Sequence, residues 1–344
     1  MMARMAAVVL AAAVANLRAA PEAAPDGDVP VAPIAPSVYG IWTNALVLRT
    51  AAAEAVVVPD IGRVCSFAPS DGSNMLHVAA ALASHASGRR SGAGSWRDFG
   101  GVWGWPVHED SWPRIRAEGG SPDEMFEGRP WTGRAWRTAD GTAVCAMLLD
   151  FGPPVNLRLT RTLRLGRHTA SLEIRQRIER TAPSTIPAGP SVLVRIVAPQ
   201  RLVFPADGDA EPAVRPMAFE APPGFAVTRA PDAAVYRVDL GGEHRLAATS
   251  PRPWVAAELP RHLLLLRAST DGSNAMPQAS AYVHRGAAHA ELELAAPGQR
   301  LRPGEILEQT VFLECFPEPA NLGDRELAVR TRLLAGEREA ASVP

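Results

Sequence analysis

The densest group of residues that could do chemistry lies at 99–113, where Trp103, Trp105 and Trp112 stand beside His108 and Glu109. An indole offers a flat apolar face, while imidazole and carboxylate groups exchange hydrogen bonds with hydroxyls. A sugar presents both kinds of surface, a C–H face and a rim of hydroxyl groups. The segment therefore predicts a carbohydrate site in which the indoles stack. The alternative is that these tryptophans only pack the loop onto the fold.

Short strands are the elements that must position this segment. Residues 156–165 alternate apolar and polar side chains, with Leu157, Leu159, Leu163 and Leu165 on one face and only Arg161 interrupting it. Residues 170–180 repeat the alternation, which is typical of a sheet with one wet face. Many such strands, separated by turns rich in Gly and Pro, predict an all-β fold, a large antiparallel sandwich with few short helices.

Four segments are expected along the chain. Residues 1–20 have a basic Arg4, an apolar run from Ala6 to Ala15 and small residues after it, as in a secretory signal peptide. Residues 21–37 are expected to be a flexible leader rich in Pro and Ala, and residues 38–318 one β-domain. Residues 319–344 form a tail with a surface helix near 325–334. The signal predicts export to the periplasm or the extracellular space, with a retained anchor as the alternative.

Composition narrows the classes of function. The formal net charge is -1, which disfavours nucleic acid and anionic membranes as partners. All 35 basic residues are Arg, so lysine Schiff-base chemistry is excluded. Cys65, Cys145 and Cys315 each lie in an apolar run, which favours buried thiols over a disulfide. We expect no cofactor and no metal, although His284 and His289 leave a metal site conceivable. A monomer is expected.

Three segments resemble the galactose mutarotase-like superfamily, in an exported and uncharacterised branch of it. The first is 44–48 with the Gly62-Arg63 step after it, and the second is Gly-Gly-x-x-x-Trp-Pro at 100–106. The third is the Glu-containing stretch 289–294, followed by Leu-x-Pro-Gly-Glu at 301–305 and the apolar run 310–313. The similarity covers residues 40–316, and it implies a β-supersandwich with a sugar site on its concave face.

The resemblance also implies roles for single residues. In the enzymes of this superfamily, which include aldose epimerases, a Glu near the C-terminus takes the proton of the anomeric hydroxyl and a His protonates the ring oxygen. Glu291 matches that Glu, and Glu293 is the second candidate on the same face. The mid-chain stretch 181–197 that should carry the His contains none, and Ser191 or Arg195 lies nearest to its place. His108 is then the candidate acid, and Arg63 points into the site.

Three hypotheses follow. The first is an exported carbohydrate-binding protein, in which Arg63, Arg195, His108, Glu109, Glu291 and Glu293 bind hydroxyls while Trp103, Trp105 and Trp112 stack. The second is an aldose 1-epimerase or another carbohydrate-active enzyme, with Glu291 as base and His108 as acid. The third is a structural or interaction domain of the cell envelope, in which the Trp residues are only core.

Overall fold

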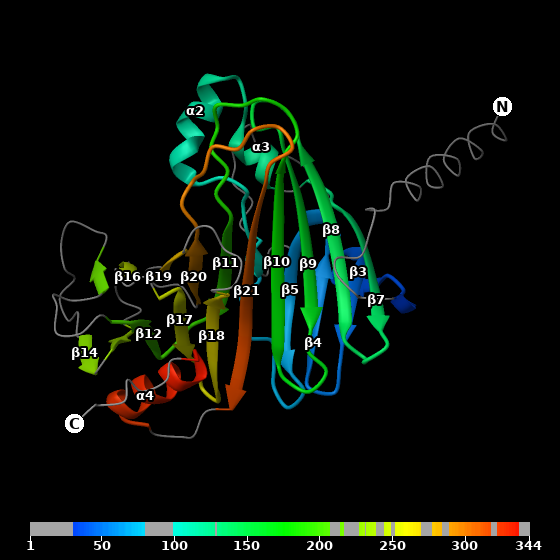
Figure 1. Cartoon of the computed structure of the whole chain (residues 1–344). Helices are drawn as coiled ribbons and strands as arrows, with labels where there is room; N and C mark the ends of the chain where they lie inside the picture. Colours follow the sequence, from blue (N-terminus) through cyan, green and yellow to red (C-terminus); the bar gives the residue numbers. More distant parts are fainter. Residues whose placement is uncertain are drawn as a thin grey trace.

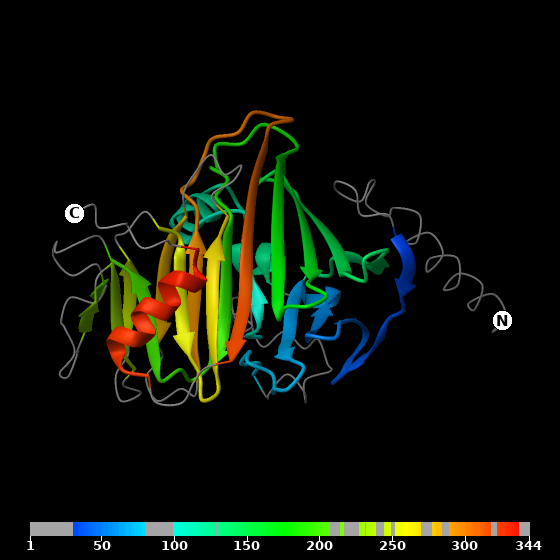
Figure 2. The ribbon, with the colours of Figure 1, turned by 60° about the horizontal axis from the view of Figure 1, so that its bottom comes forward.

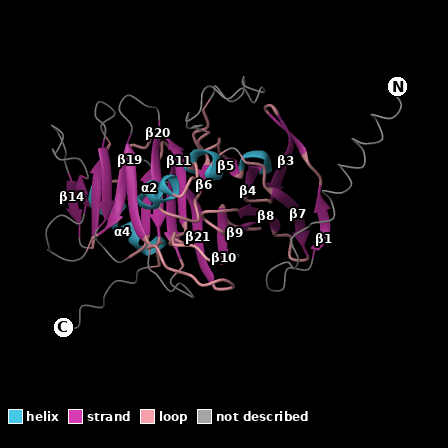
Figure 3. Ribbon diagram, turned by 90° about the horizontal axis from the view of Figure 1, so that it is seen from above, coloured by secondary structure: helices cyan, strands magenta, loops and turns pink. Residues whose placement is uncertain are grey.

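The structure is a computed structural model that describes residues 30–79, 99–127, 129–206, 214–216, 227–230, 232–238, 244–248, 252–269, 277–283, 289–317 and 322–336. The signal peptide predicted at 1–20 lies outside these residues, as do Trp96 and His284. Strands dominate, and helices are few and short, as the cyan and magenta ribbons of Figure 3 show. None of the helices in the described part of the chain has the length and apolar character needed to cross a membrane.

Two antiparallel sheets form the fold. The first has, in spatial order, β1 (Pro30–Ile34), β7 (Thr132–Thr138), β8 (Ala143–Phe151), β9 (Leu157–Leu165), β10 (Ser171–Arg180), β21 (Ile306–Pro317), β18 (His262–Ala268), β17 (Trp254–Glu258), β12 (Arg201–Pro205), β15 (Ala233–Arg237) and β14 (Val227–Ala230). The second has β13 (Val214–Pro216), β16 (His244–Ala248), β19 (Gln278–Val283), β20 (His289–Ala295), β11 (Ser191–Val197), β6 (Val102–Trp103), β5 (Arg63–Pro69), β4 (Ala53–Val58), β3 (Trp42–Arg49) and β2 (Ser37–Tyr39).

Short helices lie at the ends of the sheets. At one end are η3 (Glu109–Ser111), α2 (Trp112–Ala117) and α3 (Pro122–Phe126), which Figure 1 shows at the top. The single turn η1 (Pro59–Ile61) joins β4 to β5. Helix α4 (Asp324–Leu334) confirms the helix expected near 325–334. These elements give the all-β architecture predicted from the alternating strands.

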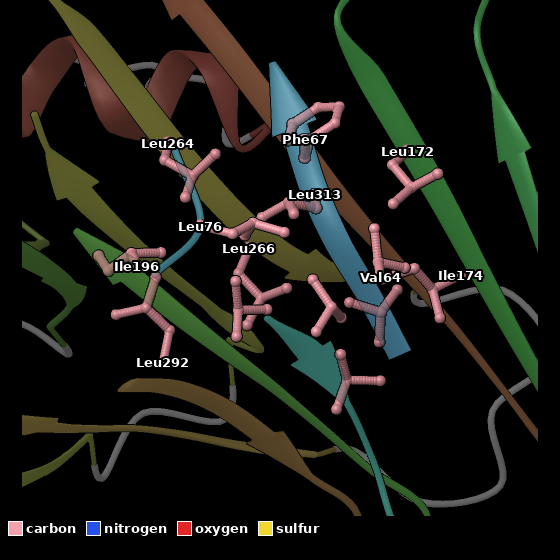
Figure 4. Close-up of a cluster of buried hydrophobic side chains, with 14 of the residues drawn as sticks. Val64, Phe67, Leu76, Leu172, Ile174, Ile196, Leu264, Leu266, Leu292 and Leu313 are labelled. Atoms are coloured by element: carbon pink, nitrogen blue, oxygen red, sulfur yellow. The ribbon is translucent and has the colours of Figure 1, made fainter. Parts of the chain in front are cut away.

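The hydrophobic core fills the space between the two sheets. Leu172 and Ile174 of β10 and Leu266 of β18 meet Ile196 of β11 and Leu292 of β20 there (Figure 4). The alternation of β9 and β10 explains this directly, because every second side chain of each strand is buried. Burying these side chains contributes about 1.5–3 kcal/mol each. On each strand of the second sheet, the residues that alternate with these core residues must point away from the core.

The predicted leader is shorter than expected. Residues 30–34 pair with β7, and residues 37–39 pair with β3, so the β-structure begins eight residues before position 38. Pro30 and Pro33 are tolerated in β1 because this strand lies at the edge of its sheet, where a missing N–H leaves no gap in the ladder. This is the physical reason why a Pro-rich stretch can still form a strand.

The three cysteines are buried and none forms a disulfide, as expected. Burial raises the pKa of the Cys145 thiol to about 12. Burial also raises the pKa of Cys65 to about 12, although the nearby Arg63 acts in the opposite direction. A thiol with so high a pKa carries little thiolate at neutral pH and is a poor nucleophile.

Helix α4 is attached to the first sheet by an apolar contact and by a charge cluster at its first residue. Leu327 and Ala328 pack against buried side chains of that sheet, and the helix lies against it in Figure 2 (red). Asp324 accepts hydrogen bonds from Arg201 at 2.7 Å and Thr228 at 2.8 Å. Burial raises the pKa of Asp324, but these bonds outweigh it and lower the pKa below its usual value.

We expect Asp324→Asn to lower the free energy of unfolding by about 1–3 kcal/mol at pH 7, because the buried Arg201 and the half-buried Thr228 lose a charged acceptor. A carboxyl whose pKa is depressed by folding stabilises the protein above its unfolded pKa of about 3.9, and this contribution is lost as the pH falls through the folded pKa. The difference between variant and wild type should therefore shrink as the pH falls below about 4.

Urea denaturation at several pH values measures this difference. Asp150→Asn is the matched control, because Asp150 forms an exposed ion pair with Arg158, with side chains 55% and 42% exposed. Such pairs contribute at most about 1 kcal/mol. Equal effects of the two substitutions at pH 7 would contradict the role assigned to Asp324.

Candidate functional site

Arg195 and Glu291 form an ion pair on the outer face of the second sheet, the face turned away from the first sheet. Val194 of β11 and Leu292 of β20 point into the core, so their neighbours along each strand point outward. Antiparallel pairing sets Arg195 directly opposite Glu291. Arg195 Nε donates to Glu291 Oε1 at 2.9 Å, and Arg195 Nη2 donates to the same oxygen. The pair is only partly buried, with side-chain exposures of 5% for Arg195 and 17% for Glu291.

Two histidines lie beside this pair. The backbone N–H of His77 donates to the Arg195 carbonyl at 2.9 Å, which places His77 next to β11. His289 precedes Glu291 by two residues on β20, so both side chains point to the same face. The two imidazole rings stack with centroids 4.4 Å apart and planes 23° apart. Both residues are half-buried, so the outer face carries imidazole as well as carboxylate and guanidinium groups.

Two further side chains of the same face continue the cluster. Tyr282 of β19 stands opposite Glu291 on the side away from Arg195. Glu293 follows two residues after Glu291 and accepts a hydrogen bond from Ser280 Oγ at 3.0 Å. We define the outer-face site by its six polar residues, which are His77, Arg195, Tyr282, His289, Glu291 and Glu293.

Trp103 lies at the inner edge of the outer-face site, between two guanidinium groups. The Cζ atoms of Arg63 and Arg195 are 4.4 Å and 5.6 Å from the centre of a ring of Trp103. The residue is 6% exposed, and its Nε1 has no hydrogen-bond partner among the described residues. Stacking of cations on an indole stabilises both partners. The ring of Trp103 therefore packs against the guanidinium of Arg195 and helps to hold it in place.

Arg63 is held by a buried ion pair with Glu127. Arg63 Nη2 and Glu127 Oε2 are 2.5 Å apart, with side-chain exposures of 2% and 4%. Arg63 Nη1 donates to the Gly100 carbonyl at 2.9 Å, and Trp105 Nε1 donates to Glu127 at 3.4 Å. The guanidinium of Arg63 is therefore enclosed by the loops it holds together, and its contact with a ligand stays a prediction.

Gly100 and Gly101 allow these loops to approach each other closely. Both have positive φ, +70° and +76°, which L-residues with side chains adopt rarely. A Cβ on Gly100 would lie 2.2 Å from the His77 carbonyl oxygen, and one on Gly101 would lie 2.3 Å from that of Val64. The Gly-Gly step thus brings His77 against the sheet. The close approach and the positive φ explain why the Gly-Gly pair of the Gly-Gly-x-x-x-Trp-Pro motif is needed at this place.

The expectation that the indole rings lie open to solvent in a groove is wrong. Trp105 is 4% exposed, and Trp103 is almost as buried. Trp112 is half-buried and packs edge to face on Trp105, with ring centroids 5.3 Å apart. All three belong to an apolar cluster with Phe151 and Leu159 of the first sheet. A long loop needs a core of its own, and here the indoles provide it.

His108 and Glu109 lie away from the outer-face site. The His108 ring nitrogen Nε2 hydrogen bonds to the Ala296 carbonyl, beyond the end of β20. Ala296 follows Glu291 by five residues, which is about 16 Å along an extended strand. Glu109 is exposed in η3. His108 therefore contacts the chain beyond the end of β20 and does not belong to the outer-face site, and its pairing with Glu291 as acid and base stays a prediction.

Of the predicted site residues, the structure brings together Arg195, Glu291 and Glu293. His77 was not predicted as a site residue, because a lone His in a short apolar stretch carries no periodic signal. His289 could have been predicted as a site residue, since it stands two residues before Glu291 and therefore lies on the same face of the strand. The acidic, basic and imidazole groups at the outer-face site can donate and accept hydrogen bonds at once, which suits a ligand with several hydroxyl groups.

Comparison with solved structures identifies the fold. The Slr1438 protein from Synechocystis sp. PCC 6803 matches with a TM-score of 0.56 and 15% identity, over 85% of this chain and 100% of that protein. A galactose mutarotase-like protein from Lactobacillus casei ATCC 334 matches with a TM-score of 0.54 and 10% identity, over 79% of this chain and 100% of that one. Neither protein-family models nor curated sequences match the chain. The chain has the galactose mutarotase-like fold that the three motifs implied.

Proposed function

We propose that this protein binds a carbohydrate at the outer-face site of its galactose mutarotase-like fold, and that binding rather than rapid turnover is its role. The Arg195–Glu291 pair is the observation that carries the proposal. It sets a charged donor and a charged acceptor side by side on two rigid strands, with Tyr282 and two imidazoles around them. A protein that binds two adjacent sugar hydroxyls at once needs such a combination of hydrogen-bond donors and acceptors.

The chemistry of the pair favours binding over catalysis. A general base must offer an oxygen to the proton it removes. Oε1 of Glu291 accepts two hydrogen bonds from Arg195, so that oxygen is already engaged. Polar side chains held by a neighbour are well suited to fix the orientation of a ligand.

The second candidate function is an aldose epimerase, and the proximity of His77 and His289 to Glu291 favours it. In this reading one imidazole, in place of His108, is the acid and Glu291 is the base. Polarimetry of freshly dissolved aldoses distinguishes the two functions. Acceleration of mutarotation that disappears in both His77→Ala and Glu291→Gln would establish the enzyme and overturn the proposal of binding without turnover.

A glycan array, followed by calorimetry with the best ligand, tests carbohydrate binding. We expect Glu291→Gln to weaken binding about 10- to 100-fold, since a hydrogen bond to a charged group contributes about 1.5–3 kcal/mol. Glu173→Gln is the matched control, because Glu173 lies on the outward face of the first sheet and faces Arg164 at 3.8 Å. Equal affinity of the wild type and Glu291→Gln, or no glycan bound at all, would contradict the proposed site.

Export is also part of the proposal. Its support is the arrangement of residues 1–20, a basic residue followed by ten apolar ones and a small-residue region. N-terminal sequencing of the protein from a culture that expresses the full chain tests it. A mature protein that begins near residue 21 is expected, and an uncleaved chain in the cytoplasm would contradict export.

A further inference from the structure

A pocket lies at the opposite end of the fold from α2 and α3. In Figure 1 this is the lower end, where β21 finishes and where β9 turns into β10. The pocket has a volume of about 570 Å³, within the usual range for sites of small molecules. Both sheets contribute to its lining, through the β3–β4 and β9–β10 turns and the ends of β5 and β21. We call it the lower pocket.

Two hydrogen bonds to backbone carbonyls hold the walls of the lower pocket in place. Thr50 Oγ1 donates to the Gly166 carbonyl at 2.9 Å and ties the β3–β4 turn to the β9–β10 turn. The Cys315 N–H donates to the Ala170 carbonyl at 2.8 Å and fixes the end of β21 against that second turn. Walls tied in this way remain open without a ligand, so a ligand need not order them when it binds.

The lining of the lower pocket has an apolar part and two charged parts of opposite sign. Ala52, Pro69, Ala170 and Cys315 supply the apolar part. Asp71 gives a negative charge at the end of β5, with His262 Nε2 at 3.8 Å from its Oδ1. Arg167 gives a positive charge from the β9–β10 turn, and His168 follows it.

The remaining carboxylate of the lining is already neutralised. Glu314 forms an ion pair with Arg267 at 2.5 Å, with side chains 16% and 29% exposed. Arg167 donates to the backbone carbonyl of Asp140 at 3.2 Å, which orients its guanidinium but leaves its charge. Asp71, which faces His262, and Arg167 are both exposed to solvent, so a ligand can reach one negative and one positive group on different elements. A ligand with a single charge would face one of them unfavourably.

We propose that the lower pocket binds a short peptide with free termini. Its ammonium group pairs with Asp71, its carboxylate pairs with Arg167, and its side chains cover the apolar lining. The volume of about 570 Å³ lies in the range of sites for small molecules and favours a ligand of about two or three residues. This site is independent of the proposed carbohydrate site, because the two lie on different faces and share no residue.

Calorimetry with alanyl-phenylalanine tests the lower pocket. Saturable binding is expected at millimolar concentration, and both the N-acetylated and the C-amidated dipeptide should bind at least about 5-fold more weakly, since each lacks one charge. Asp71→Asn should weaken the parent dipeptide but not the acetylated one, and Arg167→Gln should weaken the parent but not the amidated one. Arg164→Gln, which changes an Arg three residues away on the outward face, is the control and should bind like the wild type.

A second measurement does not depend on the variants. Cys315 lines the lower pocket and is 7% exposed, while Cys65 and Cys145 are fully buried. Burial raises the pKa of the Cys315 thiol to about 12, so its alkylation is slow and must be followed over hours by mass spectrometry of its peptide. The dipeptide should slow this reaction by at least about 3-fold at saturation. Lack of saturable heat up to about 20 mM dipeptide, equal binding of the blocked dipeptides, or no protection of Cys315 would each overturn the proposal.

Discussion

Glu127→Ala is expected to lower the free energy of unfolding by about 3–5 kcal/mol, the largest loss that we predict for one substitution. The variant would leave the guanidinium of Arg63 buried without its partner, and that side chain is 2% exposed. It would also remove the acceptor of the Trp105 Nε1–H group. Domains are stable by about 5–15 kcal/mol, so a loss of this size approaches global unfolding. Urea denaturation followed by tryptophan fluorescence measures it.

Two companion variants separate the buried charge from other causes. In Arg63→Met with Glu127→Leu both charges are removed, and most of the lost stability should return, because apolar residues of similar volume often replace a buried pair at little cost. Glu54→Ala removes a carboxylate from the exposed pair with Arg49, whose side chain is 68% exposed, and should change stability by less than about 1 kcal/mol. A loss below about 1 kcal/mol for Glu127→Ala would refute the role of Arg63.

The strands could be predicted because their signal is local. Leu157, Leu159, Leu163 and Leu165 alternate with polar residues, and each of them is buried in β9 as the period of two requires. The edge strand β1 could not be predicted, since Pro30 and Pro33 favour a coil locally, and only pairing with β7 makes a strand there. Pairing with a distant segment is decided by the whole fold and has no local signature.

The candidate site was predicted in part for the same reason. Glu291 and Glu293 share a face because they stand two residues apart on one strand, which the sequence displays. The pairing of Glu291 with Arg195 joins residues that are 96 positions apart, and it depends on the register of β11 and β20. The burial of Trp103 and Trp105 depends on which elements cover them, so residue type alone could not distinguish an open indole from a core one.

Arg161 is the residue that interrupts the leucine face of β9, and its position explains the exception. Its Nη1 donates to the Gly62 carbonyl and its Nη2 to the Gly104 carbonyl, both at 2.9 Å. Gly62 precedes the first residue of β5, and Gly104 follows the last residue of β6. A side chain of the first sheet thus reaches across the core and fixes two strand ends of the second sheet, next to Arg63 and Trp103.

Burying the charged guanidinium of Arg161 costs free energy of desolvation, and its hydrogen bonds must offset this cost. Burial lowers the pKa of Arg161, and the neighbouring Arg63 lowers it further. The guanidinium also stacks on Trp131, with its Cζ atom 4.9 Å from the ring centre, and donates to Gln176 Oε1 at 3.1 Å. An apolar residue in this place would remove the penalty but would leave three acceptors without this donor.

We expect Arg161→Met to lower the free energy of unfolding by about 2–4 kcal/mol, since the lost donors outweigh the gain from removing a buried charge. Below its unfolding transition, the variant should also bind the glycan proposed for the outer-face site about 10-fold more weakly, because Arg161 holds the strand end next to Trp103, whose ring lies against Arg195. Denaturation and calorimetry on the same preparation measure the two effects.

Arg158→Met is the matched control on the same strand, because Arg158 points outward and its side chain is 42% exposed. It should change stability by less than about 1 kcal/mol and leave binding unchanged. If Arg161→Met is as stable as the wild type, the strand ends at Gly62 and Gly104 need no support from the first sheet. If it is less stable but binds with full affinity, the outer-face site is organised by the second sheet alone, and the coupling between core and site that we infer from Arg161 is absent.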